Sequence, residues 1–168
     1  VYEEFLPQLR GQNAIRIYQE MVSNDSTAAA VLNAINLIVG SVKWDVAPAD
    51  QTPEAQDEAE FAKSLMDDMS HSWGDFVTEV LTMLTFGWAY HEIVYKRRVV
   101  PESADPAQRS KHTDGRIGIR KLAPRSQDTL QRWEFQEDGG VAGLWQQPFM
   151  AGEVKFIPIE RALLFRTV

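Results

Sequence analysis

The chain has 168 residues, of which 44% are hydrophobic and 10% aromatic, so its length suits one domain and its composition is that of a globular protein. It contains no cysteine, which excludes disulfides and thiolate metal sites, and no apolar run approaches the roughly 20 residues that a membrane-spanning helix needs. The formal net charge of −7 disfavours general DNA binding, because such affinity comes from neutralised phosphates.

Apolar residues at helical spacing begin the chain. Residues 13–22 form one helical pattern, and Asp25 or Ser26 can cap a second helix. We expect this second helix to be packed inward through one apolar stripe. The stripe consists of Ala28, Val31, Leu32, Ile35, Ile38, Val39 and Val42. Residues 43–48 then alternate in polarity and end on Pro48, which predicts a short strand.

Two more helices are predicted before the pattern changes. Thr52 can cap a helix over residues 53–69, where Pro53 suits the first turn. The stretch from Trp73 to Leu84 carries the clearest amphipathic pattern of the chain. Gly87 is predicted to end this helix in a left-handed conformation.

Beyond Gly87 the apolar residues alternate, which predicts strands. Strands are expected at residues 88–99, 116–122, 129–135, 141–146, 154–157 and 162–166. The polar residues 100–114, which include two prolines, predict a long exposed loop. Helices followed by mostly antiparallel strands define an α+β fold, and we expect residues 1–168 to form a single region.

The last predicted strand is rich in apolar residues. Leu163, Leu164 and Phe165 need cover, and we expect that cover to come from outside residues 1–168. For this reason the sequence is expected to be a piece of a longer protein.

Charge is distributed unevenly along the chain. Residues 1–95 carry 15 acidic and 4 basic side chains, whereas residues 96–125 carry 9 basic and 3 acidic ones. Such a basic stretch can contact DNA phosphates or an acidic neighbouring subunit, or it can simply be the solvated end of a hairpin. Both interpretations stay open. The candidate contact residues are Lys96, Arg97, Arg98, Arg109, Lys111 and Arg116, and the stretch continues with Arg120, Lys121 and Arg125.

The sequence contains no complete catalytic motif that we can recognise. His91 and Glu92 resemble the start of a zinc-protease helix, but Tyr95 stands where the second histidine ligand belongs. An acidic cluster of Asp57, Glu58, Glu60, Asp67 and Asp68 is explained more simply by a solvated helix face than by a divalent metal site. We therefore predict no enzymatic activity, no catalytic, cofactor-binding or metal-binding residue, and no cofactor.

Short segments in a fixed order carry a resemblance that spans most of the chain. They are residues 17–21 (IYQEM), 44–48 (WDVAP), 72–76 (SWGDF), 84–89 (LTFGWA), 91–96 (HEIVYK), 114–118 (DGRIG), 129–135 (TLQRWEF), 143–147 (GLWQQ), 157–160 (IPIE) and 163–166 (LLFR). Together they resemble the portal proteins of tailed bacteriophages, including the Mu-like group. Each segment alone is weakly specific, and the ordered series is more so.

The resemblance implies a structural virion protein. Portal proteins form a ring, usually of about twelve subunits, at one capsid vertex, through which phage DNA is packaged and ejected. The partners implied are other copies of the chain, the major capsid protein, the terminase, head–tail connector or adaptor proteins and the DNA in the channel, with no membrane. The chain would form the N-terminal wing portion, and the protein would be found in the virion and, during assembly, in the host cytoplasm. The alternatives are another connector or capsid protein and, less favoured, an unrecognised metal-dependent enzyme.

Overall fold

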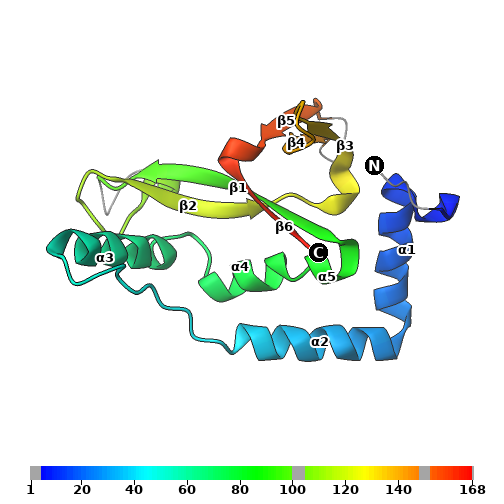
Figure 1. The fold of residues 1–168 in the computed structure, drawn as a ribbon, viewed down its shortest axis with the longest axis horizontal. Helices are drawn as coiled ribbons and strands as arrows, with labels where there is room; N and C mark the ends of the chain where they lie inside the picture. The colour runs from blue at the N-terminus through cyan, green and yellow to red at the C-terminus, as the bar shows by residue number, and fades with distance from the viewer. Residues whose placement is uncertain (1–4, 100–104, 148–151, 168) are drawn as a thin grey trace.

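The computed structural model describes residues 5–99, 105–147 and 152–167. Helices precede antiparallel strands, which confirms the predicted α+β class (Figure 1). The helices are α1 (Gly11–Asn24), α2 (Ser26–Gly40), α3 (Pro53–Asp67), α4 (Trp73–Val80) and the short α5 (Met83–Phe86). Within the described part of the chain, no helix is both long and apolar enough to cross a membrane.

Side-chain caps fix where the helices begin. The Asp25 carboxylate accepts hydrogen bonds from the backbone N–H groups of Thr27 and Ala28 at the start of α2. The Thr52 hydroxyl accepts one from the Ala55 N–H at the start of α3, and Ser72 and Asp75 form a reciprocal capping box on α4. The predicted caps at Asp25 and Thr52 are confirmed.

The strands form two separate three-stranded sheets. The first sheet has the order β2-β1-β6 and is built from β2 (Ile117–Pro124), β1 (Trp88–Arg97) and β6 (Ala162–Arg166). The second has the order β3-β4-β5 and is built from β3 (Leu130–Phe135), β4 (Val141–Gln146) and β5 (Lys155–Pro158). Gly87 directs the chain from α5 into β1 with φ of +80°, which confirms the predicted left-handed end of the helix.

The core lies where the two sheets meet. Tyr90 of β1 is buried with Leu144, Ile157 and Ala162, and its hydroxyl donates a hydrogen bond of 2.9 Å to the Ile157 carbonyl oxygen. Partly buried hydrophobic residues surround this group: Trp88, Leu130, Trp133, Ile159 and Leu164. Burial raises the pKa of Tyr90 to about 12, so this hydroxyl remains a donor at neutral pH.

Several boundaries differ from the prediction. Residues 43–48 form no strand, because no neighbouring strand lies beside them to complete the hydrogen bonds. The helix predicted from Trp73 to Leu84 ends at Val80, and a turn separates it from α5. The strand at 162–166 matches β6, which pairs with β1.

The apolar residues of β6 are covered within the chain more than expected. Leu164 packs against the core, and the Phe165 ring lies 6.0 Å from the Phe76 ring of α4. All three residues from Leu163 to Phe165 are half-buried. The expectation that they depend on cover from outside is therefore wrong for the side that faces α4 and the core.

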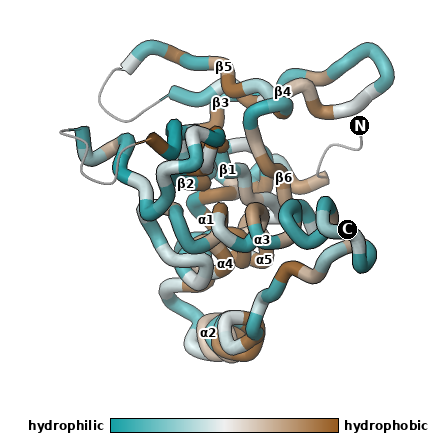
Figure 2. The backbone as a smooth tube through the Cα atoms, turned by 90° about the vertical axis from the view of Figure 1, so that its left-hand side faces the viewer, coloured by the Kyte–Doolittle hydropathy of each residue, from teal (hydrophilic) through white to brown (hydrophobic). Residues whose placement is uncertain are grey.

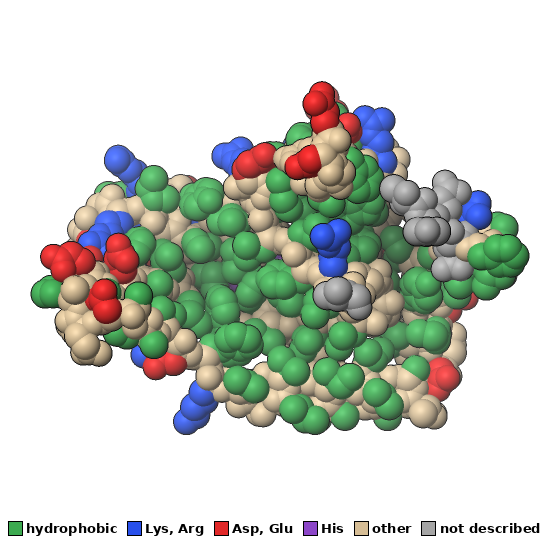
Figure 3. Space-filling view, in the orientation of Figure 1, with side chains coloured by type: hydrophobic (Ala, Val, Ile, Leu, Met, Phe, Trp, Pro, Cys, Tyr) green, Lys and Arg blue, Asp and Glu red, His purple; other side chains and the backbone are tan. Residues whose placement is uncertain are grey.

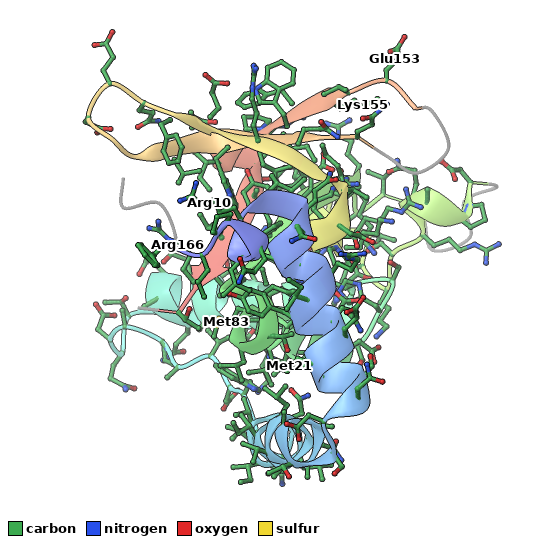
Figure 4. All side chains as sticks on the ribbon, turned by 90° about the vertical axis from the view of Figure 1, so that its right-hand side faces the viewer. Arg10, Met21, Met83, Glu153, Lys155 and Arg166 are labelled. Atoms are coloured by element: carbon green, nitrogen blue, oxygen red, sulfur yellow. The ribbon has the colours of Figure 1, made fainter. Side chains whose placement is uncertain are left out.

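The orientation of α2 is a further correction. The predicted inward stripe included Val31, Ile38 and Val42, yet these three side chains are exposed. The helix meets α1 and α4 through a rotated stripe, whose half-buried members are Ala28, Ala29, Leu32, Ile35, Asn36 and Val39. In Figure 2 α2 lies at the edge of the molecule, and Figure 4 shows α1 standing between α2 and the second sheet.

Candidate contact surface at the basic end of the first sheet

The far end of the β1–β2 hairpin lies against α3 (Figure 1). We call this region the basic end and define it as residues 96–98 and 105–121. The helix brings the acidic residues of the sequence to one side of the contact, and the hairpin brings the basic ones to the other.

A buried ion pair lies at the centre of the contact. The Lys96 ammonium is 3.0 Å from Asp68 Oδ2, and the two side chains are 4% and 2% exposed. Lys96 also donates a hydrogen bond of 2.7 Å to the Arg109 carbonyl oxygen. Each charge is thus balanced and hydrogen-bonded, which is what a buried ion pair requires.

Asp68 also anchors the loop that joins the two strands. Its carboxylate accepts hydrogen bonds from the Ser110 hydroxyl at 2.7 Å and from the Lys111 backbone N–H at 2.8 Å. Burial alone would raise the pKa of Asp68, but these bonds and Lys96 outweigh it, so the pKa lies below the ordinary value. The carboxylate is therefore ionised at neutral pH.

Two arginines lie over the ring of Phe61 on α3. Arg98 is 2% exposed, is 3.0 Å from Asp114 Oδ2 and donates a hydrogen bond of 2.8 Å to the Ser64 hydroxyl. Arg116 is 2.7 Å from Asp57 Oδ2. The two guanidinium carbons lie 5.1 Å and 4.7 Å from the Phe61 centroid, within the range of cation–π attraction.

The six predicted contact residues lie in different surroundings. Lys96 and Arg98 are buried and cannot reach DNA or another subunit at an open surface. Arg116 is paired with Asp57, and the Lys111 ammonium donates to the Asp67 carbonyl oxygen. The side chains of Arg97 and Arg109 are exposed and form no ion pair with a residue that the structure describes.

The predicted exposed loop lies partly outside the described residues, which begin again at residue 105. From there to residue 114 the backbone follows the surface, but Ser110 is only 6% exposed. The anchor at Asp68 was not predicted, because the whole acidic cluster was interpreted as a solvated helix face. Asp57 and Asp67 are exposed, as that interpretation expects, whereas Asp68 is buried and pairs with Lys96. Only the opposite charges of the two stretches could have suggested this pairing.

His91 lies in the interior, away from the basic end. It is 1% exposed on β1, and its ring makes edge contacts with the rings of Phe76 and Phe165. Its Nε2 atom is 3.6 Å from Glu79 Oε2, and burial lowers the pKa of His91 to about 4. Glu92, the next residue, forms an ion pair with Arg125.

No catalytic arrangement can be assembled around this histidine from the described residues. The adjacent Glu92 has its partner elsewhere, as the alternation of a strand requires. Among the described residues, no group of three or more His, Asp or Glu side chains could hold a metal ion. His91 is best explained as part of the aromatic packing between α4 and the first sheet.

Comparison with known families gives the class of protein. The family model described as the portal protein of Mu bacteriophage matches residues 15–167, which include α2 through β6 and most of α1. The chain therefore belongs to the Mu bacteriophage portal protein family, and its role is structural. A comparison with curated proteins finds no match.

Proposed function

We propose that this chain is part of a subunit of the portal ring at one capsid vertex, through which phage DNA is packaged and ejected. The observation that carries the proposal is the family match over residues 15–167, which extends through the helices and both sheets. Within that ring we assign the chain to the wing, the outer part of the subunit. A virion protein of this kind contacts the major capsid protein, the terminase and the head–tail connector proteins.

The basic end has a limited part in this proposal. Of the six candidate residues, Arg97 and Arg109 have exposed side chains that form neither an ion pair nor a side-chain hydrogen bond with a residue that the structure describes. Two cations can contact a few phosphates or an acidic patch on a neighbouring subunit, but they cannot make an acidic chain bind DNA generally. We therefore favour a local contact over a DNA-binding surface.

A second candidate is another structural protein of the head–tail connection or the capsid. It would share the composition and the absence of a catalytic arrangement among the described residues. The family match favours the portal protein, because it is specific to portal proteins and covers nearly the whole chain. The proposed role involves no chemistry, so nuclease, protease and ATPase assays of the purified protein should read as background.

Electron microscopy of the complete natural protein tests the proposal. Purified at concentrations on the order of micromolar, the protein should show closed rings of about twelve subunits in top view. A protein that stays monomeric under these conditions would contradict the portal assignment. Shells or sheets without a closed ring would favour the capsid alternative.

A further inference from the structure

Helix α2 has a composition that a solvated helix rarely has. Its 15 residues include no charged side chain, and none of them is buried in the described structure. Val31 is 55% exposed, and Leu37 and Ile38 are each 68% exposed. Figure 3 shows many hydrophobic side chains at the lower right edge of the molecule, where α2 lies.

These exposed residues lie on the side of α2 that faces away from its half-buried stripe. Val31 and Ile38 are seven residues apart, two turns along the same side of the helix, and Leu37 lies about 100° around the helix from Ile38. Val42 and Trp44, which follow the helix in the sequence, are each 52% exposed, and the Trp44 ring lies 6.2 Å from the Trp73 ring. Single exposed apolar residues are normal on a protein, whereas a contiguous group of them marks an interaction surface. We call this group the α2 face.

The chemistry of the α2 face restricts its partner. A helix without charge offers no cation to the phosphates of DNA, so it lacks the main source of affinity for nucleic acid. The chain carries a net charge of −7, so two copies repel each other through much of their surface, but not through an uncharged helix. A surface that is apolar and uncharged is therefore the place where another acidic copy can approach.

A second group of exposed apolar side chains lies at the opposite end of the same chain. In the views of Figures 1, 2 and 4, α2 and the second sheet lie on opposite sides of the molecule. The second sheet and the residues beside it expose Phe135, Val154 and Phe156, which are 52%, 47% and 38% exposed. Two different apolar surfaces at opposite ends can join copies head to tail, and such contacts close into a ring when the rotation permits.

We propose that the α2 face of one copy binds the second-sheet end of a neighbouring copy. This inference rests on the proposed portal function and adds the surfaces that join its subunits. The half-buried stripe of α2 holds the helix to α1 and α4, and the exposed stripe is left for the neighbour. Burying the exposed stripe removes apolar area from water, which is the main driving force of subunit association.

Single-cysteine cross-linking tests the proposal, because residues 1–168 contain no cysteine that would be labelled as well. Leu37→Cys in the complete natural protein would carry a benzophenone photo-cross-linker. Subunits grown with and without nitrogen-15 would be mixed, unfolded and reassembled before irradiation. The matched control is Leu32→Cys, one residue past Val31 on the half-buried side of the same helix.

The mass of each cross-linked peptide pair shows whether it joins two copies. We expect Leu37→Cys to give mixed-isotope pairs with residues 130–158, and Leu32→Cys to give pairs within one copy. Pairs from Leu37→Cys that stay within one copy would overturn the proposal, because another part of the same polypeptide would cover α2. Pairs between copies that lie outside the second sheet would overturn it as well. If electron microscopy shows rings in either case, the portal function stands and only the assignment of the surfaces fails.

Discussion

The basic end and α2 differ from their sequence-based predictions in opposite directions, one by being more buried and the other by being more exposed. The basic end looks like a contact surface in the sequence, yet Lys96 and Arg98 are buried and paired with acids of the same chain. Helix α2 looks like a core element, yet Val31, Leu37 and Ile38 are exposed. A basic stretch in a sequence therefore need not be exposed to a partner, because its charges can pair within the chain. An apolar stretch likewise need not be buried within one chain.

The basic end and α2 are expected to have different roles, one in folding and the other in assembly. The basic end should contribute to the stability of the folded chain, because its buried polar groups would be left without partners if one were removed. The exposed stripe of α2 should contribute to assembly and little to folding. Substitutions in the two regions can separate these roles.

The largest effect is expected from Asp68→Ala. The change leaves the buried Lys96 ammonium without a counter-charge and leaves the Ser110 hydroxyl and Lys111 N–H without their acceptor. We expect the free energy of unfolding, measured with urea, to fall by about 3 kcal/mol or more. The control is Asp45→Ala, which breaks an exposed ion pair with Lys63 and should leave the midpoint nearly unchanged. Equal effects of the two substitutions would show that burial of the Asp68 pair does not matter.

A pH dependence is expected from the interior of the first sheet. The pKa of His91 in the folded state is about 4, whereas the ordinary pKa of histidine in an unfolded chain is 6.5. Between these two values the unfolded state binds the proton and the folded state does not. Stability should therefore fall as the pH drops from 6.5 towards 4, by at most about 1.4 kcal/mol per pH unit from this group. Above pH 6.5 this contribution is constant.

His91→Phe isolates this contribution, because the ring can still pack against Phe76 and Phe165. Urea midpoints measured over a pH series should show a shallower slope for His91→Phe than for the natural protein. Parallel slopes would mean that the pKa of His91 is not lowered in the folded state, because the nearby Glu79 carboxylate would then stabilise the protonated ring. Helix α2 has no ionisable side chain, so no such pH dependence is expected of its outer face.

A smaller and local effect is expected at the loop of the basic end. Ser110 is buried between Arg109 and Lys111, and the Lys111 N–H is bound to Asp68. Trypsin should therefore cut after Arg109 and Lys111 slowly in the natural protein and several-fold faster in Asp68→Asn, which keeps the size of the side chain. Mass spectrometry of the first peptides gives both rates. Identical rates would indicate that Asp68 does not hold the loop.

The smallest effect is expected from Asp25→Ala at the start of α2. The carboxylate accepts hydrogen bonds from the Thr27 and Ala28 N–H groups, and its loss should cost about 1 kcal/mol. Ser26→Ala is the control, because the Ser26 hydroxyl forms no hydrogen bond with a described residue. Urea unfolding of both variants gives the comparison. Equal losses would show that the aspartate does not act as the cap.

Local signals were enough to predict much of this fold. Asp25 and Thr52 begin helices because their side chains bond backbone groups two or three residues away, and Gly87 ends one because of its own conformation. The apolar run of residues 162–166 matches β6 for a similar reason. Each of these signals depends on residues that are close in the sequence.

What could not be predicted depends on residues far apart in the sequence. The pairing of Lys96 with Asp68 joins two stretches that were interpreted separately, one as a contact surface and the other as a solvated helix face. The rotation of α2 is set by its contacts with α1 and α4, and the apolar residues are so numerous that more than one stripe fits the helical period. Residues 43–48 alternate like a strand, but only a neighbouring strand could have made them one.

Native mass spectrometry of the complete natural protein tests the central claim most directly. A variant with Leu37→Asp and Ile38→Asp would be compared with Ile117→Asp, an equally exposed apolar position on β2. We expect the natural protein and Ile117→Asp to give the mass of a closed ring, and the double variant to give the mass of single subunits. The urea midpoint of the double variant should be nearly the same as that of dissociated subunits of the natural protein. A ring of undiminished stability from the double variant would contradict the account, because the α2 face would then not join the subunits.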